Sequence, residues 1–190
     1  AAMLAYQALF DRGTIKKGGK VLINGAGGGV GVFGLQMAKI NGAHVTGVDA
    51  DHKHQMMKDI GYDEVIDYRN VDFTKMGKKY DLILDTKSTR WAKACKKCLE
   101  PGGRYVTIGG ELLKLMQLFL LQKMGDKNLI VVGLKQNRDA QQVHEWYEAG
   151  YLKPFIDGPY PIEKTAWAFN RFGNAQHTGK VIIQVATSPM

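Results

Sequence analysis

A short apolar run that ends in a cluster of glycines constrains this chain more than any other feature. Residues 21–23 are Val-Leu-Ile, Asn24 follows, and five of the next seven residues are glycine. A helical pattern begins directly afterwards, so the predicted order is strand, tight turn, helix. The first N–H groups of a helix have no intrahelical partner and lie at the positive end of the helix dipole, where they can bind a diphosphate. The glycine turn, residues 25–31, therefore predicts a nucleotide-binding site.

The glycine turn alone is a weak signal, because such turns are common and a plain strand-to-helix turn without a ligand is the alternative. The best match to G-x-G-x-x-G places Ala26 in the first glycine position, followed by Gly28 and Gly31. A second apolar run ends at Asp49, eighteen positions after Gly31 and close to where a ribose-binding carboxylate belongs. Asp49 is also compatible with a role as N-cap of the helix that follows.

Short, apolar, β-branched stretches alternate with helical patterns along residues 1–150. Strands that are apolar on both faces are expected to be parallel and covered by helices. Six of them predict an α/β, Rossmann-type doubly wound sheet of order 3-2-1-4-5-6. Strands are expected at residues 20–24, 43–48, 64–66, 80–85, 104–108 and 128–134, and helices at residues 1–12, 29–41, 52–60, 89–99, 111–124 and 138–149.

The candidate ligand-binding groups converge in this predicted sheet. A ligand binds outside the carboxyl ends of the strands, at the point where the strand order reverses between the first and fourth strands. The glycine turn, Asp49, Thr86 and Gly109–Gly110 all follow the carboxyl ends of predicted strands. This convergence favours a nucleotide site over a plain turn.

The alternation stops after residue 150. Three prolines at positions 154, 159 and 161 predict an extended passage, which a helix over 162–172 and a strand over 179–185 follow. We expect residues 1–150 to form a dinucleotide-binding domain. Residues 151–190 are expected to form an appendage that packs partly against a segment outside this chain.

The chain carries a net charge of +8, and its lysines gather in small clusters. A basic surface attracts anions, including nucleic acids and dinucleotides. Because no aromatic residues are interleaved with these clusters and no nucleic-acid motif accompanies them, we interpret them as a solvated basic face without a nucleic-acid partner.

Two cysteines, Cys95 and Cys98, form a C-x-x-C pair. They lie inside a predicted helix rather than at its start, and no second Cys/His cluster completes a tetrahedral site. We therefore expect two incidental thiols and no zinc. The sequence shows neither a signal peptide nor a stretch long enough to cross a membrane, which predicts a cytoplasmic protein without a membrane partner.

Nine short motifs follow one another in a fixed order over nearly the whole chain. They lie at residues 5–9, 18–23, 25–31, 36–39, 65–68, 81–85, 99–106, 154–157 and 177–182. In this order they resemble the second half of a medium-chain dehydrogenase/reductase, especially the zinc-independent quinone oxidoreductase-like and enoyl-reductase-like branch. Members of that family carry a catalytic domain before this part. The resemblance thus implies a fragment with no catalytic residues of its own, whose substrate contacts and any zinc ligands belong to the preceding domain.

The resemblance also implies roles for individual residues. The diphosphate would contact the glycine turn, and the nicotinamide half would pass the ends of the fourth, fifth and sixth strands. Leu4 departs from the threonine that many members carry near the nicotinamide ring. The residues implied for the cofactor are Gly28, Gly29, Val30 and Gly31 for the diphosphate, Thr86 and Ser88 for the nicotinamide ribose, and Ile108, Gly109, Gly110 and Leu134 for the nicotinamide.

The choice between the two nicotinamide cofactors depends on the adenosine ribose. Asp49 occupies the position that favours the unmodified ribose of NAD(H), because a carboxylate repels a 2′-phosphate. By resemblance, Lys53 and Tyr68 match the positions that hold that phosphate in NADPH-dependent quinone reductases. Lys53 also lies four residues after Asp49 and can pair with it. The balance slightly favours NAD(H) over NADP(H).

The leading interpretation is therefore the cofactor-binding domain of an NAD(P)(H)-dependent oxidoreductase that transfers hydride to or from an alcohol, a quinone or an enone. An S-adenosylmethionine-dependent methyltransferase and a non-catalytic dinucleotide-binding module are the alternatives. The sixth strand is a predicted sheet edge with apolar residues, and an unpaired edge favours self-association. We expect a homodimer through this edge.

Overall fold

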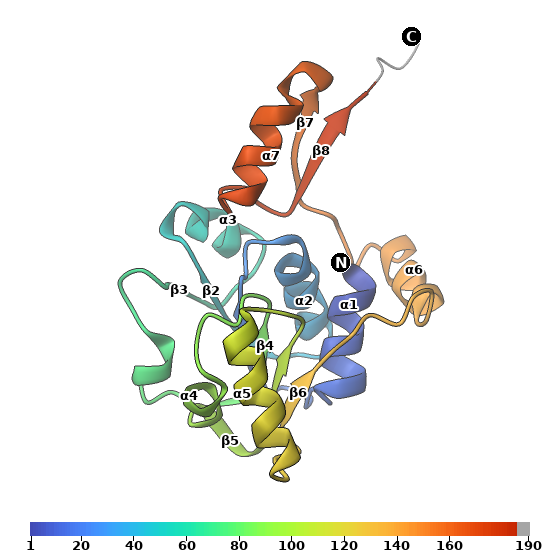
Figure 1. Cartoon of the computed structure of the whole chain (residues 1–190). Helices are drawn as coiled ribbons and strands as arrows, with labels where there is room; N and C mark the ends of the chain where they lie inside the picture. Colours follow the sequence, from blue (N-terminus) through green and yellow to red (C-terminus); the bar gives the residue numbers. More distant parts are fainter. Residues whose placement is uncertain (186–190) are drawn as a thin grey trace.

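The computed structural model describes residues 1–185, which form a six-stranded parallel sheet covered by helices and a smaller second unit (Figure 1). The strand order β3-β2-β1-β4-β5-β6 confirms the predicted doubly wound sheet. All five strand pairings in this sheet are parallel. The strands are β1 (Lys20–Asn24), β2 (His44–Asp49), β3 (Glu64–Asp67), β4 (Tyr80–Asp85), β5 (Leu99–Thr107) and β6 (Leu129–Val131).

Each face of the sheet carries its own apolar core, because successive strand residues point to opposite faces. In β1, Val21 and Ile23 belong to one core and Leu22 to the other. The first core is completed by residues from α1 (Ala2–Tyr6), η1 (Gln7–Arg12), α2 (Gly29–Ile40), α3 (His54–Asp59) and α6 (Ala140–Glu148). The second takes residues from η3 (Phe73–Lys75), α4 (Ala92–Lys96) and α5 (Leu112–Lys123).

Helix α2 begins directly against the end of β1. Gly28 is its N-cap in an extended conformation, with φ of −86° and ψ of 170°. A Cβ atom on Gly31 would lie only 2.4 Å from the carbonyl oxygen of Ala26. Glycine at position 31 therefore lets the first turn of α2 pack on the turn that precedes it. This contact fixes the N-terminus of α2 at the carboxyl ends of the strands.

The predicted boundaries around β5 are wrong. Helix α4 ends at Lys96, and β5 begins at Leu99 rather than at residue 104. The ladder with β4 pairs Tyr80 with Leu99 and then Leu82 with Arg104, so residues 100–103 bulge out of it. A bulge accommodates the Pro-Gly-Gly sequence that was expected to separate helix from strand.

The end of the sixth strand also differs from the prediction. Strand β6 ends at Val131, so Leu134 lies in the following loop and not at a strand end. After β6, the side chain of Gln7 makes backbone hydrogen bonds that a neighbouring strand would make inside a sheet. Its Nε2 donates to the Lys135 carbonyl at 3.0 Å, and its Oε1 accepts from the Lys135 amide at 3.0 Å. The expected helix over residues 1–12 forms, but its second half, η1, winds as a π-helix.

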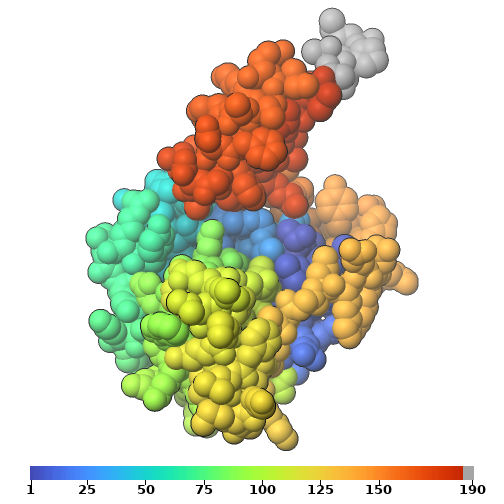
Figure 2. All heavy atoms as spheres, viewed as in Figure 1, coloured from blue at the N-terminus to red at the C-terminus, as the bar shows by residue number. Residues whose placement is uncertain are grey.

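Residues 156–184 form the second unit, which stands as a separate lobe above the main sheet (Figure 2). It consists of β7 (Ile156–Pro161), η4 (Ile162–Lys164), α7 (Thr165–Gly173) and β8 (Lys180–Gln184), with β7 and β8 paired in parallel. The predicted helix and last strand are present, whereas the expected extended passage is strand β7. The Gly179 amide donates to the Gly27 carbonyl at 2.8 Å and so attaches this unit to the glycine turn.

The close packing at Gly31 yields a stability prediction. Gly31→Ala should lower the free energy of unfolding by about 1–3 kcal/mol, because the added methyl group meets backbone oxygens that cannot move away easily. Gly29→Ala is the matched control, since its Cβ would meet nothing nearer than 3.4 Å. Urea denaturation of both variants measures the difference. Equal losses for the two variants would contradict the packing described for α2.

Candidate functional site

A cavity of about 600 Å³ lies between the carboxyl ends of the central strands and the second unit. Cavities of this size are typical of small-molecule and cofactor sites. Both the main sheet and the second unit line it, the second unit with residues of α7, β8 and the segment between them. From the main sheet the lining residues include Gly25, Gly28, Gly29, Val30, Asp49, Lys53, Thr86, Lys87 and Ile108.

The glycine turn presents the N-terminus of α2 to this cavity. Gly28, Gly29 and Val30 line it, and the N-cap makes no side-chain hydrogen bond. The positive end of the dipole of this twelve-residue helix, where the first N–H groups lack intrahelical partners, therefore borders the cavity. Gly31 lies behind them, packed against Ala26. This geometry suits an anionic group such as a diphosphate.

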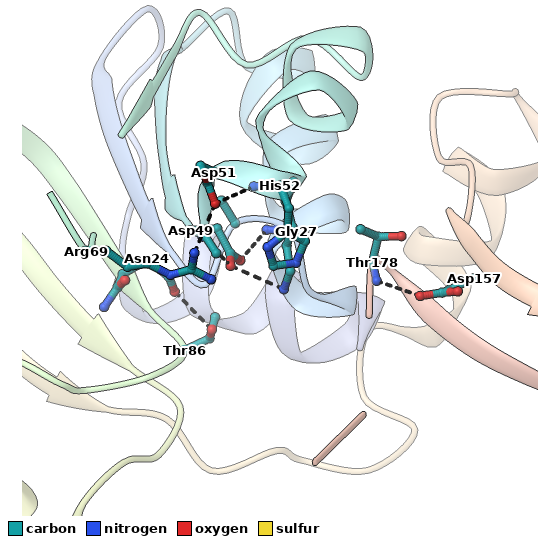
Figure 3. Close-up of polar contacts among 12 residues, drawn as sticks. Asn24, Gly27, Asp49, Asp51, His52, Arg69, Thr86, Asp157 and Thr178 are labelled. Carbon is teal, nitrogen blue, oxygen red and sulfur yellow. Dashed lines mark hydrogen bonds and ion pairs between the residues drawn. The ribbon is translucent and has the colours of Figure 1, made fainter. Parts of the chain in front are cut away.

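Asp49, at the end of β2, ties the glycine turn to the sheet (Figure 3). Its Oδ2 accepts from the Gly27 amide at 2.9 Å, and its Oδ1 accepts from the Ala50 amide at 2.9 Å. The N-cap interpretation of Asp49 is wrong, because the helical turn after β2 has Ala50 as its N-cap and no side-chain cap bond. The carboxylate instead lies in the wall of the cavity.

Lys53 forms a buried ion pair with Asp49. The side chain of Lys53 is 1% exposed, and its Nζ lies 3.2 Å from Oδ1 of Asp49. Burial lowers the pKa of Lys53, and the neighbouring carboxylate of Asp49 opposes this shift. A Cβ atom on Gly27 would lie 2.6 Å from Cδ of Lys53. The lysine stem therefore packs on the glycine turn, and its charge offsets that of Asp49.

Tyr68 lies beyond the end of β3 and is about half exposed. It is not among the cavity-lining residues. The guanidinium group of Arg69 lies 5.9 Å from the Tyr68 ring centroid and donates to Asp51 at 3.1 Å (Figure 3). Arg69, like Tyr68, is not among the cavity-lining residues.

Of the other residues predicted from the sequence, some line the cavity and the rest do not. Thr86 and Ile108 line the cavity at the ends of β4 and β5. Ser88 is 2% exposed and lies behind the cavity wall, in contact with Gly109 and Gly110. The structure thus brings Gly28, Gly29, Val30, Asp49, Lys53, Thr86 and Ile108 together around the cavity, while Gly31, Tyr68, Ser88, Gly109, Gly110 and Leu134 do not line it.

Three basic residues of the cavity were not among those predicted from the sequence, namely Lys87, His177 and Lys180. Lys87 and Lys180 are exposed, and neither forms an ion pair with another residue in the described part of the chain. His177 is buried and stacks on Phe172, and burial, followed by the charge of Lys53, lowers its pKa. In the sequence, the one local indication that Lys87 belongs to the site is its position directly after Thr86.

The charges around the cavity sum to a net positive value. Among the described side chains that line it, three are lysines and only Asp49 is acidic. Because Lys53 offsets Asp49, Lys87 and Lys180 remain to attract an anion. The cavity is therefore electrostatically suited to a ligand with about two negative charges.

No metal site is formed within residues 1–185, where no group of three or more His, Cys, Asp or Glu side chains could hold a metal ion. Cys95 and Cys98 are both buried free thiols, and burial raises the pKa of Cys95. No zinc-dependent step is assigned to these residues. In the same range, every helix is too short or too polar to cross a membrane.

Known proteins share sequence with nearly the whole of this chain. A family model described as zinc-binding dehydrogenase matches residues 60–183. The NAD(P)H oxidoreductase RTN4IP1, mitochondrial, of Bos taurus is 32% identical over 97% of this chain and 55% of its own length. The trans-enoyl reductase pgmF of Aspergillus terreus is 27% identical over 96% of this chain and 56% of its own length.

A solved structure shares the fold. The quinone oxidoreductase from Coxiella burnetii superposes with a TM-score of 0.80 at 21% identity, over 97% of this chain and 58% of that one. The chain spans about half the length of the curated relatives it matches. These likenesses favour the oxidoreductase interpretation of the glycine turn over the methyltransferase alternative.

Proposed function

Because this chain belongs to the zinc-binding dehydrogenase family, we propose that it is the cofactor-binding part of an NAD(P)(H)-dependent oxidoreductase. The observation that carries the proposal is the cavity in which the N-terminus of α2 meets Lys87 and Lys180. The bound nicotinamide would supply the hydride chemistry, with an alcohol, a quinone or an enone as the other reactant. The residues described here would bind and orient the dinucleotide.

The two halves of the sheet would hold the two halves of the dinucleotide. In a doubly wound sheet, the acidic residue at the end of the second strand lies by the adenosine ribose, and the diphosphate lies at the first helix. Asp49 and Lys53 would therefore lie beside the adenosine half of the dinucleotide. Thr86 and Ile108, across the reversal point of the strand order, mark the nicotinamide side.

We propose that the site discriminates only weakly between NAD(H) and NADP(H), with NAD(H) slightly favoured. Asp49 alone would repel a 2′-phosphate. Lys53 offsets this repulsion, because its ammonium group lies 3.2 Å from the Asp49 carboxylate in a buried pair. The same pairing keeps Lys53 from acting as a free phosphate-binding cation, so neither cofactor gains a large advantage.

We further propose that the protein forms a homodimer through the edge strand β6. Strand β6 ends the sheet, and helix α5 packs beside it. Helix α5 exposes a row of large apolar side chains, namely Leu112, Leu113, Met116, Phe119 and Leu120. A cytoplasmic location, and the absence of nucleic-acid and membrane partners, stay predictions.

A charge placed in the glycine turn tests the dinucleotide site. Gly29→Asp should raise the Kd for NADH on the order of tenfold, because its carboxylate would face the diphosphate. Gly29→Asn has nearly the same shape without the charge and should change the Kd much less. Isothermal titration calorimetry measures both variants. Unchanged binding by a folded Gly29→Asp protein would contradict the assignment of the diphosphate to α2.

Removal of the Lys53 charge tests the proposed 2′ selectivity. Lys53→Met should raise the Kd for NADPH about tenfold and that for NADH by less than about threefold, because Asp49 is then uncompensated. Lys58→Met, an exposed lysine of α3, is the control and should affect neither cofactor. An equal loss for both cofactors would show that Lys53 does not balance Asp49.

The dimer is tested by sedimentation equilibrium. The protein should sediment as a dimer at micromolar concentration, and Phe119→Glu should give a folded monomer because it places a charge in the exposed apolar row of α5. Lys123→Glu, at the end of the same helix, serves as the charge-changing control. A monomeric wild-type protein would refute the proposed interface.

A further inference from the structure

A buried carboxylate organises the loop that follows β4. Asp85 is fully buried at the end of this strand. Its Oδ1 accepts from Nδ2 of Asn24 at 2.9 Å, from the Lys87 amide at 2.9 Å and from the Ser88 amide at 2.7 Å. Its Oδ2 accepts from the Tyr105 hydroxyl at 2.9 Å. A buried carboxylate needs such donors, and these four join β1, β4 and β5 at the reversal point of the strand order.

Ser88 extends this hydrogen-bond network to the end of β5. Its φ of +48° lies in the left-handed region, which serine seldom adopts without support from its surroundings. The Asp85 carboxylate holds its amide, while its hydroxyl donates to the Gly109 carbonyl at 2.6 Å. The Thr107 hydroxyl lies against the same carbonyl at 2.8 Å. A Cβ atom on Gly110 would lie 2.1 Å from Cβ of Ser88, so the segment lies directly on this serine.

This network stands immediately behind one wall of the cavity. Thr86 and Lys87 precede Ser88, Ile108 precedes Gly109, and all three of these neighbours line the cavity. Asp85 and Ser88 themselves do not line it. The wall belongs to the second half of the sheet, across from Asp49 at the end of β2.

We propose that Asp85 and Ser88 are positioning residues for the nicotinamide half of the dinucleotide. This inference rests on the proposed function. The adenosine half and the diphosphate are assigned to β2 and α2 together with Lys87 and Lys180, and the Ser88 hydroxyl contacts none of these groups. Thr86 and Ile108, which the network holds in place, would contact the other half. Loss of the network should therefore weaken binding of the complete dinucleotide more than binding of its adenosine diphosphate portion.

The test compares NADH with ADP, which lacks the nicotinamide half. Ser88→Ala in the full 190-residue chain should raise the Kd for NADH about tenfold, because the Gly109 carbonyl loses a hydrogen bond that positions Ile108. The Kd for ADP should stay within about twofold, because the removed hydroxyl shares no hydrogen-bond partner with the residues assigned to the adenosine half and the diphosphate. Tyr105→Phe removes one donor to Asp85 without adding a group, and it should shift the ratio of the two Kd values in the same direction. Thr89→Ala, an exposed hydroxyl next in sequence, should leave both values unchanged.

The outcomes separate the two proposals. Selective loss of NADH affinity by folded Ser88→Ala and Tyr105→Phe proteins supports the positioning role. Equal losses for NADH and ADP, or no loss for either, would overturn it while leaving the dinucleotide site intact. A wild-type protein that is folded and binds neither ligand would overturn the proposed function itself.

Discussion

The packing of the glycine turn onto the ends of the strands is the constraint on which the rest of the structure depends. Gly31 lets the first turn of α2 approach the Ala26 carbonyl more closely than any side chain would permit. The Asp49 carboxylate then holds the Gly27 amide and attaches the turn to β2. From the other side, the Gly179 amide binds the Gly27 carbonyl and brings the second unit over the site. One glycine-rich turn thus joins both sheets and places the N-terminus of α2 at the cavity.

The net charge of the cavity depends on which of its charged side chains form ion pairs with each other. Asp49 and Lys53 offset each other in a buried ion pair, so they contribute little net charge. Lys87 and Lys180 keep their charge available at the cavity wall. With the helix dipole of α2, these two lysines favour a diphosphate at the centre of the site. The paired residues lie at the end of β2, where we propose that the adenosine ribose binds and where the pairing would leave little discrimination against a 2′-phosphate.

The sequence was sufficient to predict the main sheet because its signals are local and repeated. Alternating strands and helices, together with apolar residues on both strand faces, determine a parallel sheet and its order. The boundaries near Leu99 and Leu134 were wrong because tertiary contacts decide them. A bulge accommodates the Pro-Gly-Gly sequence in β5, and Gln7, more than a hundred residues away in the sequence, replaces a strand partner after β6.

The site was predictable only in part, for a similar reason. Spacing places Asp49 at the end of β2 and indicates its pairing with Lys53, but it does not reveal that the Gly27 and Ala50 amides also donate to its oxygens. Nor does it reveal that Ser88, which follows a site strand, is turned behind the cavity wall. Lys180 lies in a distant segment that reaches the cavity only because the second unit packs on the glycine turn.

The most direct measurement of the central claim is a heteronuclear NMR titration of the isotope-labelled chain with NADH. If the diphosphate binds at the N-terminus of α2, the amide signals of Gly28, Gly29 and Val30 should show the largest shifts, and the Lys180 amide should respond with them. Shifts that are absent at saturating cofactor, or that are confined to residues outside the cavity, would contradict the account.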